Sequence, residues 1–137
     1  MKISLKVDYA CRVLTQLARS YGSNKPIHLD WLASIEDVPA NYLVQILNDL
    51  RNGGLINSRR GKKGGYTLAQ APEDISLYDI IRVIDGELLD VRSTGNGESG
   101  PQVAKVWEEI ARMLESKTRE YTLDLLLRSE TKKMYYI

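Results

Sequence analysis

The chain has 137 residues, of which 43% are hydrophobic and 27% charged, and its formal net charge is +1. This length and composition suit one globular domain, or one domain with an added oligomerisation arm. No apolar run approaches the length of a membrane span, and the N-terminus lacks the apolar segment of a secretory signal, so we expect a cytoplasmic protein with no membrane partner.

Two helices are predicted in the first 36 residues. Apolar side chains at intervals of three or four predict a helix from Leu5 to Ser20. A short extended piece at residues 27–29 follows, and Asp30 is placed to cap a brief helix that ends before Pro39.

A third, amphipathic helix is predicted between Pro39 and the Gly53–Gly54 pair. Its apolar stripe consists of Leu43, Ile46, Leu47 and Leu50. The opposite face carries uncharged side chains that both donate and accept hydrogen bonds, namely Asn41, Tyr42, Gln45 and Asn48. Such side chains near a helix N-terminus can reach base edges in the major groove of DNA. Tyr42 could equally pack against the core.

The segments LINSR and GYTLA predict the two strands of a hairpin whose tip is RGKKGG, residues 60–65. From Leu50 to Tyr66 the chain has no Asp or Glu but five cations, which are Arg51, Arg59, Arg60, Lys62 and Lys63. A local basic cluster in a nearly neutral chain is typical of phosphate binding, although a charge run can also be plain solvated surface. We interpret the hairpin as a wing that meets DNA, with Tyr66 as a further candidate contact.

The remaining chain predicts a helix over residues 76–86, with Ser76 and Asp79 as a capping box, and then a linker or regulatory loop over residues 87–100. Residues 101–137 are expected to form a long helix and a shorter one. The long helix has an apolar stripe of Val103, Val106, Trp107, Ile110 and Leu114. This stripe could be one more core element, but we expect it to be the interface of a homodimer.

This order of elements predicts an α+β, mostly α fold: a winged helix-turn-helix DNA-binding domain over residues 1–86 with a long C-terminal dimerisation helix. The predicted partner is double-stranded DNA, with a small molecule or a protein as a possible effector. The alternative is a winged-helix module that binds protein and has lost DNA binding. No spacing of titratable groups suggests an enzyme, so we predict no catalytic residue and no cofactor.

The single cysteine and the single histidine exclude an intramolecular disulfide and a Cys/His zinc site. Cys11 lies on the apolar face of the first helix and is interpreted as a small buried hydrophobe. A redox-active thiol activated by the neighbouring Arg12 is the alternative. His28 is interpreted as a surface residue and not as a ligand.

The runs NYLVQILNDLRNGGLINSRRGKKGGYTLA and ISLYDIIRVIDG, together with the N-terminal MKISLKVDYACRVLTQLA and the terminal YYI, resemble a family of bacterial winged-helix regulators. The family includes the iron–sulfur-cluster regulator and the cysteine-metabolism repressor. The resemblance implies a homodimeric transcription factor, often a repressor, on a partly palindromic operator. It also implies major-groove contacts from Asn41, Tyr42 and Gln45 and a minor-groove role for Arg60.

Two features depart from the family pattern. The cluster-binding members have three cysteines in the segment that corresponds to residues 87–100, and this chain has none there, so we expect no cysteine-ligated cluster. Val44 stands where many relatives have a glutamate in the recognition helix. A valine can make only apolar contact, so the operator preference should differ.

Overall fold

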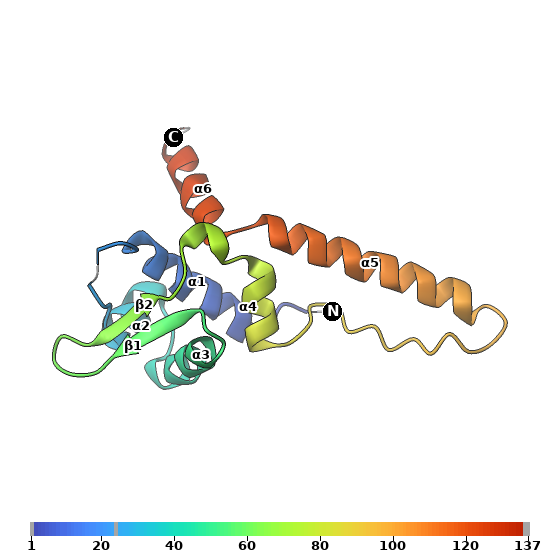
Figure 1. Cartoon of the computed structure of the whole chain (residues 1–137), viewed down its shortest axis with the longest axis horizontal. Coiled ribbons are helices and arrows are strands. Elements are labelled where there is room, and N and C mark those ends of the chain that lie inside the picture. The colour runs from blue at the N-terminus through green and yellow to red at the C-terminus, as the bar shows by residue number, and fades with distance from the viewer. Residues whose placement is uncertain (1, 24, 136–137) are drawn as a thin grey trace.

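The computed structural model describes residues 2–23 and 25–135, with side chains through Ser129. Three helices come first: α1 (Leu5–Arg19), α2 (Leu29–Glu36) and α3 (Ala40–Asn52). The two strands of an antiparallel hairpin follow, β1 (Ile56–Arg59) and β2 (Gly65–Leu68). A short 3-10 turn, η1 (Pro72–Asp74), leads to α4 (Leu77–Ile84), α5 (Gly100–Glu120) and α6 (Leu123–Tyr135). Figure 1 shows this mostly helical winged helix-turn-helix, and it confirms the predicted fold class.

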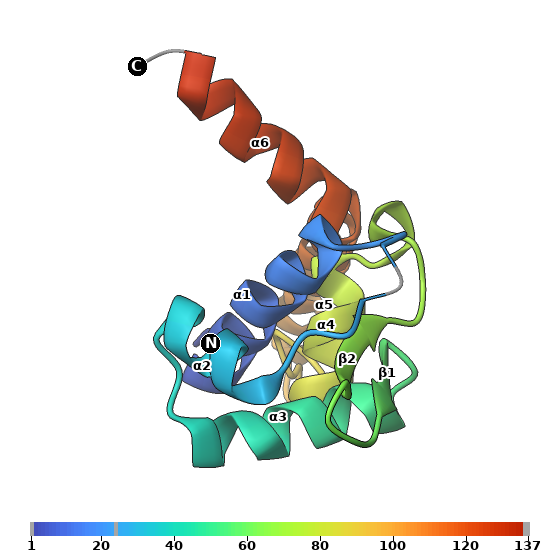
Figure 2. The same cartoon turned by 90° about the vertical axis from the view of Figure 1, so that its left-hand side faces the viewer.

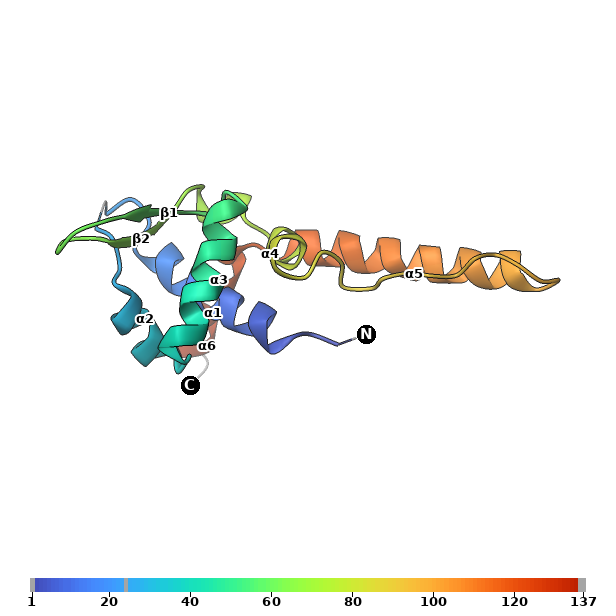
Figure 3. The same ribbon diagram turned by 90° about the horizontal axis from the view of Figure 1, so that it is seen from below.

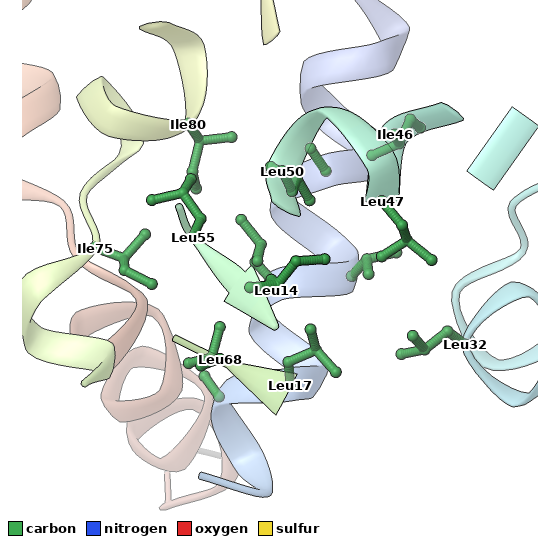
Figure 4. Packing of buried hydrophobic residues seen from close by; sticks show 14 of the residues in the cluster. Leu14, Leu17, Leu32, Ile46, Leu47, Leu50, Leu55, Leu68, Ile75 and Ile80 are labelled. Atoms are coloured by element: carbon green, nitrogen blue, oxygen red, sulfur yellow. The ribbon is translucent and has the colours of Figure 1, made fainter. Parts of the chain in front are cut away.

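The core lies where α1, α3, α4 and the hairpin meet, and α2 and α6 add one buried residue each, Leu32 and Leu123 (Figure 4). The apolar stripe predicted for α3 is fully buried there. It packs on Leu14 and Leu17 of α1 and on Ile80 of α4. Lys6 and Asp49 add an ion pair at 2.5 Å that ties α1 to α3, and this contact raises the pKa of Lys6. The uncharged face of α3 is consequently held outward.

The helix boundaries follow local capping chemistry. The Ser76 hydroxyl accepts from the backbone N–H of Asp79, and the Asp79 carboxylate accepts from the N–H of Ser76, so the predicted capping box is confirmed. Thr122 caps α6, because its hydroxyl accepts from the backbone N–H of Leu125. The predicted start of α2 is wrong by two residues. Asp30 was predicted to cap this helix, but the helix begins at Leu29 and His28 is at its cap position. Of the terminal YYI, Tyr136 and Ile137 lie outside the described residues.

The hairpin is extended on one side by Ile27, whose backbone N–H and C=O both pair with Tyr66 at 2.9 Å. Gly65 makes this approach possible. Its φ is +146°, and a Cβ built there would lie 2.5 Å from the Ile27 carbonyl oxygen. A side chain would therefore be strained and would also collide with backbone.

We predict that Gly65→Ala lowers the free energy of unfolding by roughly 3 kcal/mol, because the strained φ and the collision with Ile27 add. Gly22→Ala is the matched control, since Gly22 also has a positive φ of +88° but no heavy atom within 4 Å of its built Cβ. The control should cost only the dihedral strain, about 1 kcal/mol. Urea unfolding of both variants measures the difference. Equal losses would show that the hairpin yields to the added methyl without cost.

The C-terminal end of α3 is locked to α4. A Cβ at Gly53 would lie 2.6 and 2.7 Å from the two methyl carbons of Val83, so only a glycine permits this contact. Valine is stiff about χ1, so its methyls cannot swing aside. Helices α3 and α4 therefore behave as one packed unit.

Helix α5 projects from this unit along the longest axis of the molecule, as Figures 1 and 3 show. The segment 87–99 has no regular helix or strand and runs out beside α5, which then returns toward α4. None of the residues of α5 is buried. None of the described helices combines the length and apolar character that a bilayer crossing requires.

Candidate nucleic-acid interface

Helix α3 and the hairpin lie on one side of the molecule, opposite α6 (Figure 2). Figure 3, seen from below, shows α3 crossing this side with the hairpin next to its C-terminal end. On α3, Asn41, Gln45 and Arg51 are exposed, and Asn48 is half-buried. Val44 is 42% exposed on the same helix and offers an apolar contact between polar neighbours. This surface of α3 can donate, accept and make methyl contacts, which are the interactions that base edges offer in the major groove.

The tip of the hairpin is a tight turn closed by the Gly64 N–H, which donates to the Gly61 carbonyl at 2.9 Å. Lys62 and Lys63 are the two central residues of this turn, and both are exposed. Arg59 and Arg60, also exposed, precede the turn. We call Arg59, Arg60, Lys62 and Lys63 the wing cations. The glycines sit at the corners of the turn and leave its outermost positions to the lysines.

A hollow of about 300 Å³ separates the hairpin from the ends of α2 and α3. Three arginines line it, Arg51, Arg59 and Arg60, and no Asp or Glu does. The Nη1 of Arg51 donates a hydrogen bond of 3.4 Å to the Ser58 hydroxyl, and this contact directs Arg51 toward the hairpin. Like charges with no countercharge repel one another, so this hollow favours an anionic group such as a phosphate.

His28 also lines this basic hollow, and sequence reasoning did not place it there. The pairing of Ile27 with Tyr66 brings the start of α2 against the hairpin, so the position of His28 depends on a contact between residues far apart in the sequence. No local pattern in the sequence indicates that contact.

The two candidate tyrosines are half-buried, like Asn48, whereas the other predicted DNA contacts are exposed. Tyr42 is half-buried and packs edge-on against Tyr9 of α1, with ring centroids 5.8 Å apart. Tyr66 is half-buried in the hairpin and lines the basic hollow. Tyr42 therefore has a core contact as well as its place on α3, while Tyr66 stays at the edge of the hollow.

Cys11 is not an activated thiol. Burial, with a smaller contribution from the nearby charge of Asp8, raises its pKa to about 12. Arg12 does not offset this effect, because its guanidinium is paired with Asp8 at 2.6 Å. A thiol with so high a pKa stays protonated at neutral pH and is a poor nucleophile. The structure therefore favours the small-hydrophobe interpretation over the redox-active one.

The stripe predicted for dimerisation lies on the projecting helix. Trp107 is 47% exposed, Val103 49% and Val106 52%, and Ile110 is 36% exposed. Met113, three residues after Ile110, continues the stripe at 71% exposure, although the predicted stripe did not include it. Leu114 is half-buried and turns toward α4. An exposed apolar row of this kind is typical of an interaction surface.

Comparisons with known proteins agree with this architecture. A family model, Rrf2, described as an iron-dependent transcriptional regulator, matches residues 3–129. A candidate helix-turn-helix-type regulator of Mycobacterium tuberculosis is 40% identical over 128 residues, which cover 90% of this chain and 79% of that protein. The regulator CymR of Bacillus subtilis is 33% identical over 141 residues, covering 100% of both chains.

Two solved structures resemble the whole arrangement. CymR, the global cysteine regulator of B. subtilis, superposes with a TM-score of 0.80 at 32% identity, covering 92% of this chain and 95% of that one. T. potens IscR superposes with a TM-score of 0.78 at 32% identity, covering 95% and 88%.

The iron dependence in the family's description does not fit the ligands of this chain. A cysteine-ligated cluster needs several thiolates, and the chain has one cysteine, whose thiol is protonated at neutral pH. Among the residues that the structure describes, no three His, Cys, Asp or Glu side chains come together as ligands for a metal ion.

The family match covers nearly the whole chain, and the relatives and the solved structures agree with it in fold. The resemblance found in the sequence is confirmed. The chain belongs to the Rrf2 family of winged-helix, DNA-binding transcriptional regulators, and it is not an enzyme.

Proposed function

We propose that this protein is a homodimeric repressor that binds a partly palindromic operator and needs no cysteine-ligated cluster. The observation that carries the proposal is the basic hollow between the hairpin and α3, lined by three arginines and free of acids. It lies beside an exposed, uncharged helix face, so one side of the molecule offers both phosphate-binding and base-reading groups.

Helix α3 and the hairpin would make different kinds of contact with DNA. Asn41, Gln45 and Val44 of α3 face the bases in the major groove, where the valine contacts a thymine methyl group. The wing cations neutralise phosphates, and Arg60, at the base of the turn, is the one we place in the minor groove. Asn48 and Arg51 extend the contacts toward the backbone, with Tyr66 at the edge of the hollow.

The dimer would form through the exposed stripe of α5, with Leu114 at its margin. Two-fold symmetry then presents two copies of α3 to successive major grooves, about 34 Å apart. Residues 1–86 act as the reading domain, residues 87–100 as the loop that receives a signal, and residues 101–137 as the dimerisation arm. The protein would act in the cytoplasm. By occupying an operator that overlaps a promoter, it would block transcription from that promoter.

Selection of bound fragments from a genomic library by the purified protein tests the proposal. We expect recovery of a motif with two half-sites related by a two-fold axis. Recovery of no sequence above background would instead support the alternative, a winged-helix module that binds protein.

Gln45→Ala is expected to reduce the preference for the selected operator over random DNA by roughly tenfold, because a base contact of this kind is worth about 1–3 kcal/mol. Binding to random DNA should change less than about twofold, since the glutamine makes no phosphate contact in this arrangement. Gln102→Ala, the same change on the exposed first turn of α5, is the control and should alter neither value. Fluorescence anisotropy on both DNAs measures the two affinities. Equal losses on both would remove Gln45 from the base readout.

A further inference from the structure

A second cavity lies away from the DNA-facing side, between α4, the first residues after α4 and the C-terminal half of α5. It encloses about 310 Å³, which is at the small end of the range for ligand pockets. Six apolar side chains line it: Ile81, Leu88, Leu89, Val91, Ala111 and Leu114. Ile81 is buried and the others are half-buried, so a ligand's apolar part would be shielded from water there.

The charged groups around the cavity are of two kinds. Glu115 and Arg119 satisfy each other through an ion pair of 3.0 Å, and the Arg119 guanidinium also stacks 3.8 Å from the centre of the Tyr78 ring. Arg82 and Glu87, by contrast, line the same cavity without an ion pair to each other or to any other described side chain. The Arg82 guanidinium makes only a loose ring contact within the described part of the chain, 6.0 Å from the centre of the Tyr78 ring.

Arg82 and Glu87 place one unpaired positive charge and one unpaired negative charge at the edge of the same small apolar cavity. These two charges determine which ligand charges the cavity can accept. A dianion would be repelled by Glu87, and a simple cation would be repelled by Arg82. A zwitterion can satisfy both, with its carboxylate on the Arg82 guanidinium and its ammonium group on the Glu87 carboxylate. The apolar wall then requires an aliphatic side chain on the same molecule.

We propose that this cavity is an effector site for a small aliphatic amino acid. The proposal rests on the function proposed above, because an effector acts only if it changes operator binding. Its position suits that role: Ala111, Leu114 and Thr118 line the cavity on the face of α5 next to the exposed stripe, with Leu114 at the boundary between the two. Filling the cavity would bias the angle between α4 and α5, and α4 carries the recognition helix through Gly53 and Val83.

Leucinamide and 4-methylpentanoate each lack one of the two charged groups of L-leucine, so the three compounds serve as matched probes. The amide lacks the carboxylate, and the acid lacks the ammonium group. In calorimetric titration of the free protein, L-leucine should bind at least about tenfold more tightly than either analogue, since each analogue lacks one of the two charge-assisted hydrogen bonds. L-isoleucine, L-valine and L-methionine are titrated beside it. No saturable binding of any of the four amino acids at concentrations up to about 10 mM would overturn the proposal, because binding weaker than that falls below the affinity expected of a specific site.

Two variants separate a binding role from a structural one. R82Q should weaken L-leucine at least about tenfold and leave leucinamide within about twofold, because the amide makes no contact with the guanidinium. E87Q should weaken L-leucine in the same way and leave 4-methylpentanoate unchanged. Both side chains are exposed, so both variants should fold, which circular dichroism verifies. Three probes that bind equally to the wild type and to both variants would indicate nonspecific apolar binding and would overturn the site.

Operator binding is measured separately, with and without saturating L-leucine. A change in operator Kd of at least about threefold supports the effector role, because an effector acts through unequal affinity for two states of the protein. Binding of L-leucine with an unchanged operator Kd refutes that role. Because the calorimetric titration contains no DNA, a failure to find an operator would count against the proposed function and would leave the result for this cavity unaffected.

Discussion

Replacing the four wing cations by alanine is expected to weaken operator binding by roughly two to four orders of magnitude at about 0.1 M salt, because each phosphate that is no longer neutralised costs about tenfold there. The slope of log K against log salt concentration should fall by about 0.9 for each such phosphate. The wing cations are exposed and take part in no ion pair among the described residues, so their removal should leave the fold intact. Anisotropy titrations at several salt concentrations give both values.

The design includes a matched control. The pairs Arg59–Arg60 and Lys62–Lys63 are also changed separately, and each is compared with the double change of Lys105 and Arg112 to alanine. These two control cations are exposed on α5, on the side of the helix opposite the apolar stripe. The control should keep the wild-type slope. If the wing variants keep it as well, the hairpin does not touch phosphates and the proposed mode of binding is wrong.

Trp107→Glu combined with Ile110→Glu is expected to convert the proposed dimer to a monomer. Both side chains are exposed on a helix with no buried residue, so the new carboxylates would stay in water in the monomer. In the dimer they would be buried at the interface without a partner of opposite charge, which is costly. The monomer should keep its thermal stability, because neither side chain contributes to its core. Operator affinity should fall by roughly 10²- to 10⁴-fold, since the two half-sites are then bound independently.

Sedimentation equilibrium measures the mass, and anisotropy measures the affinity. Lys105→Glu combined with Ser116→Glu places new carboxylates on the opposite side of α5 and should leave the protein dimeric. A double variant at Trp107 and Ile110 that remains dimeric with full operator affinity would show that the two subunits meet elsewhere.

Much of the fold could be predicted because its signals are local. The capping box of Ser76 and Asp79 and the glycine pair after α3 depend on residues within one helical turn of each other. The hairpin follows from two short strands separated by a glycine-rich turn. Exposure of the wing cations follows equally, because a charged turn with no partner nearby stays in water.

What could not be predicted depends on contacts between distant segments. The strand pairing of Ile27 with Tyr66 brings His28 to the basic hollow, and no motif encodes that approach. Residues 87–100 were expected to be a linker or regulatory loop, and nothing local in their sequence indicates that Leu88, Leu89 and Val91 line a cavity with α4 and α5. The edge-on packing of Tyr42 on Tyr9 likewise depends on how α1 and α3 cross.

The contact between Gly53 and Val83 has a consequence for operator architecture. Because α3 is packed on α4 and cannot rotate on its own, each half of a dimer would move as a rigid body. The distance between the two copies of α3 would then be set only by the angle between α4 and α5. One extra base pair between half-sites moves them apart by about 3.4 Å and also rotates them around the duplex. A rigid dimer cannot adjust to both the longer distance and the rotation. The spacing between half-sites should therefore discriminate among genomic sites as strongly as base sequence does.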